Sequence, residues 1–214
     1  MNQSQAIPSS HYEADGGLTP EIVLDEEQQR RAGVYGLLAR LLRAAPDDAL
    51  LKQLSALKDM RQDGSELGLA MSMLGLSASA CSEEPVDDEY HNLFIGLGCG
   101  ELLPYGSWYL TGFLMEKPLG YLRDDLSSLG FERDESVSEP EDHIAALCEV
   151  MAMLINDGFD LETQADFFKT HMEGWVSHFF VDLGGANAAI FYKSVGRFGC
   201  AFSEFEKAYL SMTV

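Results

Sequence analysis

The stretch SEPEDHIAALCEVMAMLINDG, residues 138–158, carries the most regular helical pattern in the chain. Ser138 and Glu141 have the spacing of a capping box, and Pro140 between them suits the first turn of a helix, where its missing N–H loses no hydrogen bond. Gly158 is a residue type that commonly ends a helix. We therefore predict a buried helix here, with an apolar face made by Ile144, Leu147, Cys148, Met151, Leu154 and Ile155.

Helical spacing continues on both sides of this stretch. Toward the N-terminus it predicts a helix from about 25 to 45 and a second helix that Pro46 opens. Further helices are predicted near 67–76, 85–97, 107–113 and 118–130, and Ser107 is the expected cap of the third of these. Toward the C-terminus it predicts helices at about 161–183 and from 187 onward. Strand-like alternation is absent from the sequence. We predict an all-α fold, with one domain of about eight helices over residues 21–214 and a flexible acidic tail over residues 1–20.

The composition excludes several classes of protein. The chain has 214 residues, with 14 Lys and Arg against 35 Asp and Glu, and a formal net charge of −21. This charge repels phosphate backbones and anionic lipids, so we expect neither nucleic-acid binding nor a membrane-surface role. A hydrophobic content of 46% is too high for a disordered acidic chain. The expected partner is cationic.

The sequence favours the cytoplasm. Residues 1–20 lack the basic and apolar regions of a signal peptide, and no run of about 18 apolar residues predicts insertion into a membrane. Cys81, Cys99, Cys148 and Cys200 form no CxxC pair, which is typical of reduced thiols.

Motifs for phosphate, dinucleotide or zinc binding are absent: the chain has no GxxxxGK[ST], no GxGxxG after a strand and no HExxH. Asp142 and His143 are adjacent and cannot close a metal site alone, while His171 and His178 are too far apart along a helix for joint chelation. We expect no metal, no cofactor and no catalytic residue.

Two segments stand out as candidate binding elements. LPYGSWY, residues 103–109, places three aromatic residues around a rigid turn, either to fill a gap between helices or to dock a peptide. The second segment is EPEDH, residues 139–143. Its acidic residues either stabilise the start of a helix, or they form a binding element in which Asp142 holds a cation and His143 donates a hydrogen bond. Acidic runs at 83–89 and 132–142 adjoin these segments, and could focus a negative potential on one groove.

Three motifs, in this order and spacing, resemble the TorD/DmsD family of cytoplasmic redox-enzyme maturation chaperones: YHNLFIG at 90–96, LPYGSWYL at 103–110 and EPEDHI at 139–144. His171-Met172-x-x-Trp175 and Phe191-Tyr192 also match, and the similarity covers roughly residues 25–210. The family often has Gly-Pro after the Leu-Phe-x stretch, whereas this chain continues with a glycine-rich segment, residues 96–100.

The resemblance implies an all-helical, non-catalytic chaperone. Such proteins bind the twin-arginine signal peptide of a molybdenum-cofactor reductase or dehydrogenase precursor, assist cofactor insertion and delay export. The implied peptide site contains Tyr90, Phe94, Pro104, Tyr105, Trp108, Asp142 and His143. The physical requirements agree, because a twin-arginine peptide needs carboxylates for its guanidinium groups and an aromatic groove for its apolar stretch.

Two other functions stay open at this point. One is an all-α nucleotide-binding protein or hydrolase that uses Asp142 and His143 as a dyad. The other is an assembly factor for a nitrate reductase-like membrane enzyme, which would read a folded subunit. The segments at 96–106 and 131–138 could act as hinges, so we expect a monomer or a dimer that exchanges helices.

Overall fold

The computed structural model describes residues 24–59, 64–96, 99–133 and 138–212, and these residues form helices joined by turns. The first half contains α1 (Glu26–Arg43), α2 (Asp48–Ser55), the 3₁₀ turn η1 (Ala56–Asp59), α3 (Glu66–Ser79), α4 (Glu83–Tyr90) and the π-helical turn η2 (His91–Ile95). The second half contains α5 (Gly106–Thr111), α6 (Lys117–Ser128), α7 (Ile144–Asn156), α8 (Leu161–His171), α9 (Val176–Gly185) and α10 (Tyr192–Met212).

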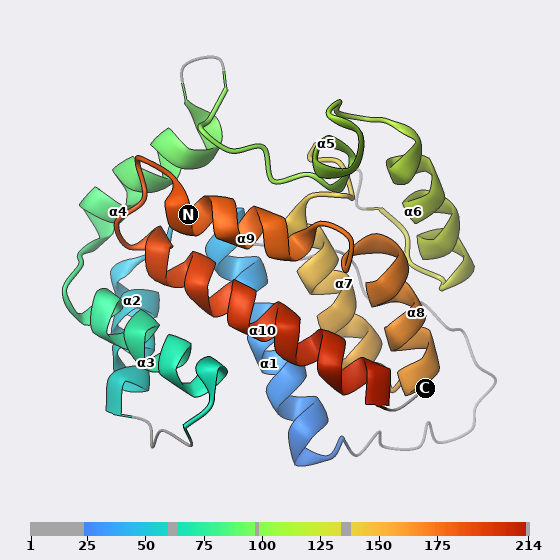
Figure 1. The fold of residues 1–214 in the computed structure, drawn as a ribbon, viewed down its shortest axis with the longest axis horizontal. Helices are drawn as coiled ribbons and strands as arrows, with labels where there is room; N and C mark the ends of the chain where they lie inside the picture. The colour runs from blue at the N-terminus through green and yellow to red at the C-terminus, as the bar shows by residue number, and fades with distance from the viewer. Residues whose placement is uncertain (1–23, 60–63, 97–98, 134–137, 213–214) are drawn as a thin grey trace.

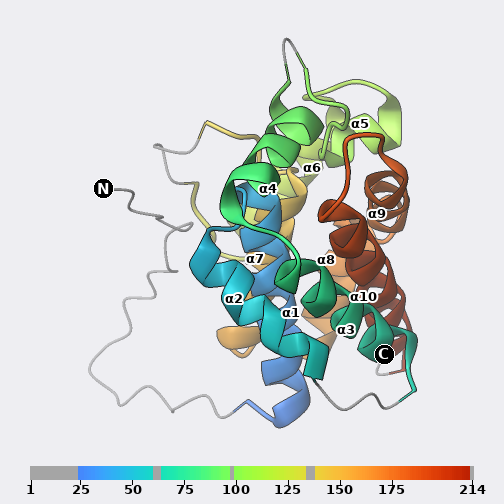
Figure 2. The same cartoon turned by 90° about the vertical axis from the view of Figure 1, so that its left-hand side faces the viewer.

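The helices surround one hydrophobic core. In its centre α1 packs along α7, and the long α10 packs against α9 and α3 (Figure 1). Helices α2, α3 and α4 gather on one side of this centre, and α5 and α6 lie at another end (Figures 1 and 2). The largest fully buried side chains include Trp175, Tyr35 and Tyr192. The predicted all-α fold is confirmed over the described residues.

The structure has ten α-helices in its described part, where the sequence predicted about eight. The predicted helix at 161–183 is wrong, because it is divided into α8 and α9 at residues 172–175. At this break the indole N–H of Trp175 donates to the carbonyl oxygen of His171 at 2.8 Å. The last helix also begins later than predicted, at Tyr192.

Helix starts were predicted less accurately than helix ends. Helix α7 begins at Ile144 with His143 as its N-cap, so the predicted capping box of Ser138 and Glu141 is wrong. Pro46 likewise precedes the N-cap of α2, which is Asp47, and Ser107 lies inside α5 instead of capping it. The helix ends at Gly130 and Gly158 are confirmed, since both glycines adopt positive φ just after α6 and α7.

Glycine is required in the connection after η2. Gly96 has φ +56°, and a Cβ there would lie 2.1 Å from the carbonyl oxygen of Cys99. A Cβ at Gly100 would lie 2.4 Å from the carbonyl oxygen of Leu93. The chain therefore folds back closely on η2 before it reaches α5. The predicted tail at residues 1–20 lies outside the described residues.

Within the described ranges, no helix is both long enough and apolar enough to cross a membrane.

Candidate functional site

The two segments singled out in the sequence pair with each other through their backbones. Tyr105 and His143 form an isolated antiparallel bridge. The N–H of Gly106 donates to the carbonyl oxygen of Asp142 at 2.9 Å, and the N–H of Ile144 donates to that of Pro104 at 2.9 Å. This pairing fixes the aromatic turn against the start of α7, although the two lie about 35 residues apart in the chain.

The end of α4 supplies the third motif. The hydroxyl of Tyr90 donates to the carbonyl oxygen of Arg43 at 2.8 Å, which anchors α4 to the end of α1. The rings of Tyr90 and Phe94 lie 5.0 Å apart, and Phe94 also meets Tyr192 edge-on. The π-helical turn closes with a hydrogen bond of 2.7 Å from the N–H of Gly96 to the carbonyl oxygen of His91. Such turns are rare and are frequent at functional sites.

These three segments line one cavity of about 370 Å³, which we call the α4 cavity. It contains five of the seven predicted site residues: Tyr90, Phe94, Pro104, Tyr105 and His143. Two carboxylates and one guanidinium, those of Asp87, Glu139 and Arg43, also line it. The cavity therefore combines aromatic surface with acidic groups.

The structure does not place Asp142 and Trp108 in this cavity. Asp142 is only 3% exposed, and its Oδ2 accepts the N–H of Ser107 at 2.7 Å, so its carboxylate binds the first turn of α5. Its Oδ1 is buried and has no hydrogen-bond partner among the described residues. Trp108 is 40% exposed on α5. Asp142 thus holds the aromatic turn in place, and Trp108 lies outside the cavity.

The imidazole of His143 is neutral. Burial, together with the nearby charge of Arg43, lowers the pKa of His143 to about 3. Its Nδ1 accepts the N–H of Ala145 at 3.1 Å, so the single proton of the neutral ring lies on Nε2. His143 can therefore donate one hydrogen bond to a ligand in the α4 cavity.

Tyr105 also stays protonated. Burial and the adjacent Glu139 raise the pKa of Tyr105, and its hydroxyl donates to the carboxylate of Glu139. Arg43 is held by the carboxylate of Glu149, with contacts of 2.7 and 2.5 Å. Asp87 and Glu139 are both exposed, so they can meet a cationic group from solution.

Three of the lining residues that were not among the predicted site residues carry a carboxylate or a guanidinium: Arg43, Asp87 and Glu139. Glu139 belongs to the EPEDH segment and Asp87 to the acidic run at 83–89, so both had a signal in the sequence. Nothing in the sequence indicated a role for Arg43 in the site, because a basic residue in the last turn of a helix is common for reasons of stability alone.

The arrangement offers no dyad and no metal centre within the described ranges. Asp142 and His143 each accept a hydrogen bond from a different backbone N–H, those of Ser107 and Ala145. No group of three or more His, Cys, Asp or Glu side chains that could hold a metal ion occurs in the described part of the chain.

Comparison with known proteins shows the family of this chain. A model of the nitrate reductase delta subunit family matches residues 43–181. The chaperone protein TorD of Vibrio parahaemolyticus is 27% identical over 57% of this chain and 62% of its own length. The TorD of Vibrio cholerae is 28% identical over 56% of this chain and 59% of its own length, and that of Histophilus somni is 25% identical over 76% of each.

The chain spans about three fifths of the length of the Vibrio relatives it matches. A solved structure described as a redox enzyme maturation protein of Archaeoglobus fulgidus overlaps 85% of this chain and 93% of its own, with a TM-score of 0.49 and 19% identity. The family model covers well over half of the 214 residues and includes all seven predicted site residues. The chain therefore belongs to the nitrate reductase delta subunit family, and its predicted membership of the TorD/DmsD family is confirmed.

Proposed function

We propose that this protein is a non-catalytic cytoplasmic chaperone that binds the twin-arginine signal peptide of a molybdenum-cofactor reductase or dehydrogenase precursor. By holding the precursor, it assists cofactor insertion and delays export until maturation is complete. The helical domain over residues 21–214 performs this role. The observation that carries the proposal is the α4 cavity, which brings Tyr90, Phe94, Tyr105 and His143 together beside exposed carboxylates.

The chemistry of the cavity matches that of the peptide. Guanidinium groups form strong, charge-assisted hydrogen bonds with carboxylates, and Asp87 and Glu139 offer two. Aromatic rings provide contact area for the apolar residues that follow the arginines. The Nε2–H of His143 adds a donor for a peptide carbonyl oxygen. Asp142 contributes by positioning the turn that carries Tyr105, and Trp108 provides an exposed contact on α5.

Calorimetry with a synthetic twin-arginine signal peptide tests this proposal. We expect Phe94→Ala to weaken binding by at least about tenfold, because a central aromatic contact is lost. We expect Glu139→Gln to weaken it by about five- to tenfold, since the amide can still accept the Tyr105 hydroxyl but carries no charge. Asp166→Asn, an exposed substitution on α8 outside the cavity, should leave affinity unchanged.

Two outcomes would contradict the proposal. If the unmodified protein does not bind the peptide, the function is wrong. If it binds but neither Phe94→Ala nor Glu139→Gln changes the affinity, the site is wrong.

A second function is favoured by the family description, which names a nitrate reductase subunit. In this alternative the protein is an assembly factor that recognises a folded part of a reductase instead of its signal peptide. Capture of the precursor with and without its N-terminal peptide separates the two, because only the assembly factor would retain the shortened precursor.

A further inference from the structure

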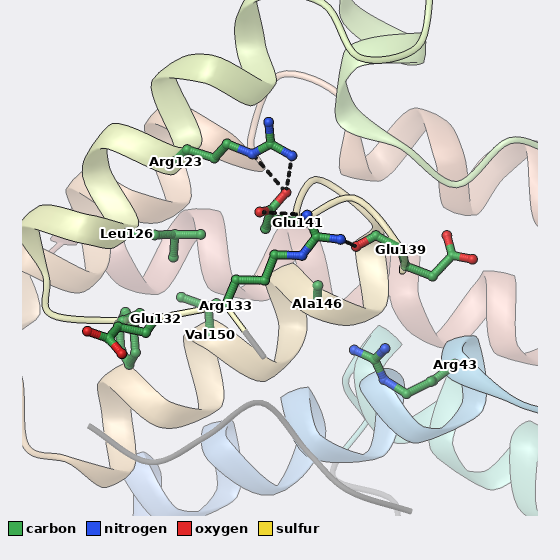
Figure 3. Close-up of a pocket in the computed structure, with 10 residues that line it drawn as sticks. Arg43, Arg123, Leu126, Glu132, Arg133, Glu139, Glu141, Ala146 and Val150 are labelled. Atoms are coloured by element: carbon green, nitrogen blue, oxygen red, sulfur yellow. Dashed lines mark hydrogen bonds and ion pairs between the residues drawn. The ribbon is translucent and has the colours of Figure 1, made fainter. Parts of the chain in front are cut away.

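A second cavity adjoins the candidate site. It has a volume of about 220 Å³, and its apolar lining comes from α6, α7 and the turn after α6: Leu126, Phe131, Ala146 and Val150. Figure 3 labels three of these side chains, Leu126, Ala146 and Val150. We call this second cavity the α6–α7 cavity. An apolar cavity of about 150 Å³ is large enough to bind benzene. The α6–α7 cavity therefore has room for a large apolar side chain.

The charged side chains around its opening balance one another. Three of the chain's 14 cationic residues, Arg43, Arg123 and Arg133, lie there with Glu132, Glu139 and Glu141. Arg123 donates to Glu141 at 2.8 Å, and Arg133 lies 3.6 Å from the same carboxylate (Figure 3). Balanced charges above an apolar floor favour an uncharged apolar group over a cationic one.

The two cavities are neighbours, because Arg43 and Glu139 line both. In the α4 cavity the carboxylates of Asp87 and Glu139 outnumber the single guanidinium of Arg43, which Glu149 already binds. Helix α4 also exposes Glu84 and Asp88. The pair of neighbouring cavities is therefore acidic at the α4 end and apolar at the α6–α7 end.

From this polarity we infer that a bound signal peptide lies in one direction, with its arginines in the α4 cavity and its apolar stretch in the α6–α7 cavity. The inference rests on the proposed function. The apolar stretch follows the arginines along such a peptide, so the peptide runs from α4, past Glu139, toward α6.

An exposed apolar surface offers the competing location for the apolar stretch. Six large apolar residues of α5, α6 and their connection are exposed: Trp108, Leu110, Phe113, Leu114, Met115 and Tyr121. None of them lines the α4 cavity, whereas Arg43 and Glu139 line both that cavity and the one between α6 and α7. These shared lining residues therefore favour the α6–α7 cavity.

Photo-crosslinking of the full chain to two labelled peptides tests the direction. Trypsin cuts after Arg61, Arg123, Arg133 and Lys169, while Lys117 precedes a proline, so three fragments separate the candidate surfaces: 62–123, 124–133 and 134–169. A benzophenone beside the arginines should label 62–123, which contains Asp87. A benzophenone in the apolar stretch should label 124–133, or Ala146 or Val150 within 134–169. Labelling of 124–133 by the arginine probe, or labelling of residues 108–121 by the apolar probe, would overturn the inference.

A substitution that fills the cavity provides an independent measurement. Ala146→Leu should weaken binding of the unmodified peptide by at least about fivefold, because the added methyl groups occupy the space of the peptide side chain. The loss of affinity caused by Ala146→Leu should be smaller for a peptide in which alanine replaces the leucines of the apolar stretch. Altered folding of the protein would not produce this dependence on the peptide side chain. Ala152→Leu, on the same helix but outside both cavities, is the matched control.

The result also separates the inference from the proposed function. If neither peptide binds, the proposed function fails. If both bind but Ala146→Leu has no more effect than Ala152→Leu, the function stands and the direction is wrong.

Discussion

At the scale of single residues, His143 links the stability of the fold to pH. Its pKa is about 3 in the folded protein and about 6.5 when the chain is unfolded, because burial disfavours the charged ring. Between about pH 3 and pH 6.5, the unfolded state therefore binds more protons than the folded state does. The stabilisation from neutral His143 is complete above about pH 6.5 and is lost progressively as the pH falls toward 3.

We expect the free energy of unfolding to fall by about 2 kcal/mol through His143 alone when the pH is lowered from 8 to about 5. Urea unfolding at both pH values measures this. His143→Asn retains an N-cap acceptor for the N–H of Ala145 but cannot titrate, so its loss over the same range should be smaller by that amount. Equal losses in the two proteins would show that His143 is not the titrating group.

Some residues of the candidate site could be predicted from the sequence, and others could not. The motifs indicated Tyr90, Phe94, Pro104, Tyr105 and His143, each of which belongs to a short pattern dense in aromatic or charged residues, and these five residues line the α4 cavity. The burial of Asp142 was not predictable from them, since an acid in a polar run is ordinarily exposed. Its carboxylate is buried because it accepts the N–H of Ser107, a contact between segments far apart in the chain.

At the scale of elements, the starts of helices were the least predictable feature. The residues before α7 match a capping box, but the carbonyl oxygen of Asp142 and the N–H of Ile144 pair instead with the turn at 104–106. The break between α8 and α9 has a similar cause, because the side chain of Trp175 takes a backbone carbonyl of the preceding helix. Local propensity could not predict these contacts, whereas the glycines that end α6 and α7 act locally and were recognised.

Glu89 shows how one element fixes the start of another. It is buried on α4, and its Oε1 accepts the N–H groups of Ile190 and Tyr192, each at 2.7 Å, while Oε2 accepts that of Phe191 at 2.9 Å. A carboxylate at the start of α10 also interacts favourably with the helix dipole. This member of the acidic run at 83–89 therefore belongs to the structure of the domain and adds nothing to an exposed acidic surface.

We expect Glu89→Gln to lower the free energy of unfolding by about 1–3 kcal/mol, because the amide NH₂ would face a backbone N–H and leave a buried donor without an acceptor. Urea denaturation monitored by circular dichroism measures the change. Asp88→Asn, at the exposed neighbouring position, should have an effect below about 0.5 kcal/mol. Similar losses in both variants would contradict the assigned role of Glu89.

At the scale of the whole molecule, a buried ion pair connects the beginning of the described chain to its end. Arg31 of α1 and Glu206 of α10 are at most 1% exposed, and their two hydrogen bonds measure 2.7 and 2.8 Å. Tyr35 donates to the same carboxylate at 3.0 Å, and the guanidinium lies over the ring of Tyr209. The periodicity of the sequence predicted both helices, but it did not predict that Arg31 and Glu206 form an ion pair in the core.

Because each charge of this pair is compensated only by its partner and a few hydrogen bonds, removing one should cost far more than removing both. We expect Glu206→Leu to lower the free energy of unfolding by about 3–5 kcal/mol, since the charge of Arg31 would stay buried without its carboxylate. The double variant Arg31→Met with Glu206→Leu should recover most of that loss. Glu26→Ala, which breaks the exposed pair with Arg30, should cost less than about 1 kcal/mol.

The three variants are compared by urea unfolding at one pH and salt concentration. A loss for Glu206→Leu no larger than that for Glu26→Ala, or a double variant no more stable than Glu206→Leu, would mean that the pair does not hold α1 and α10 together.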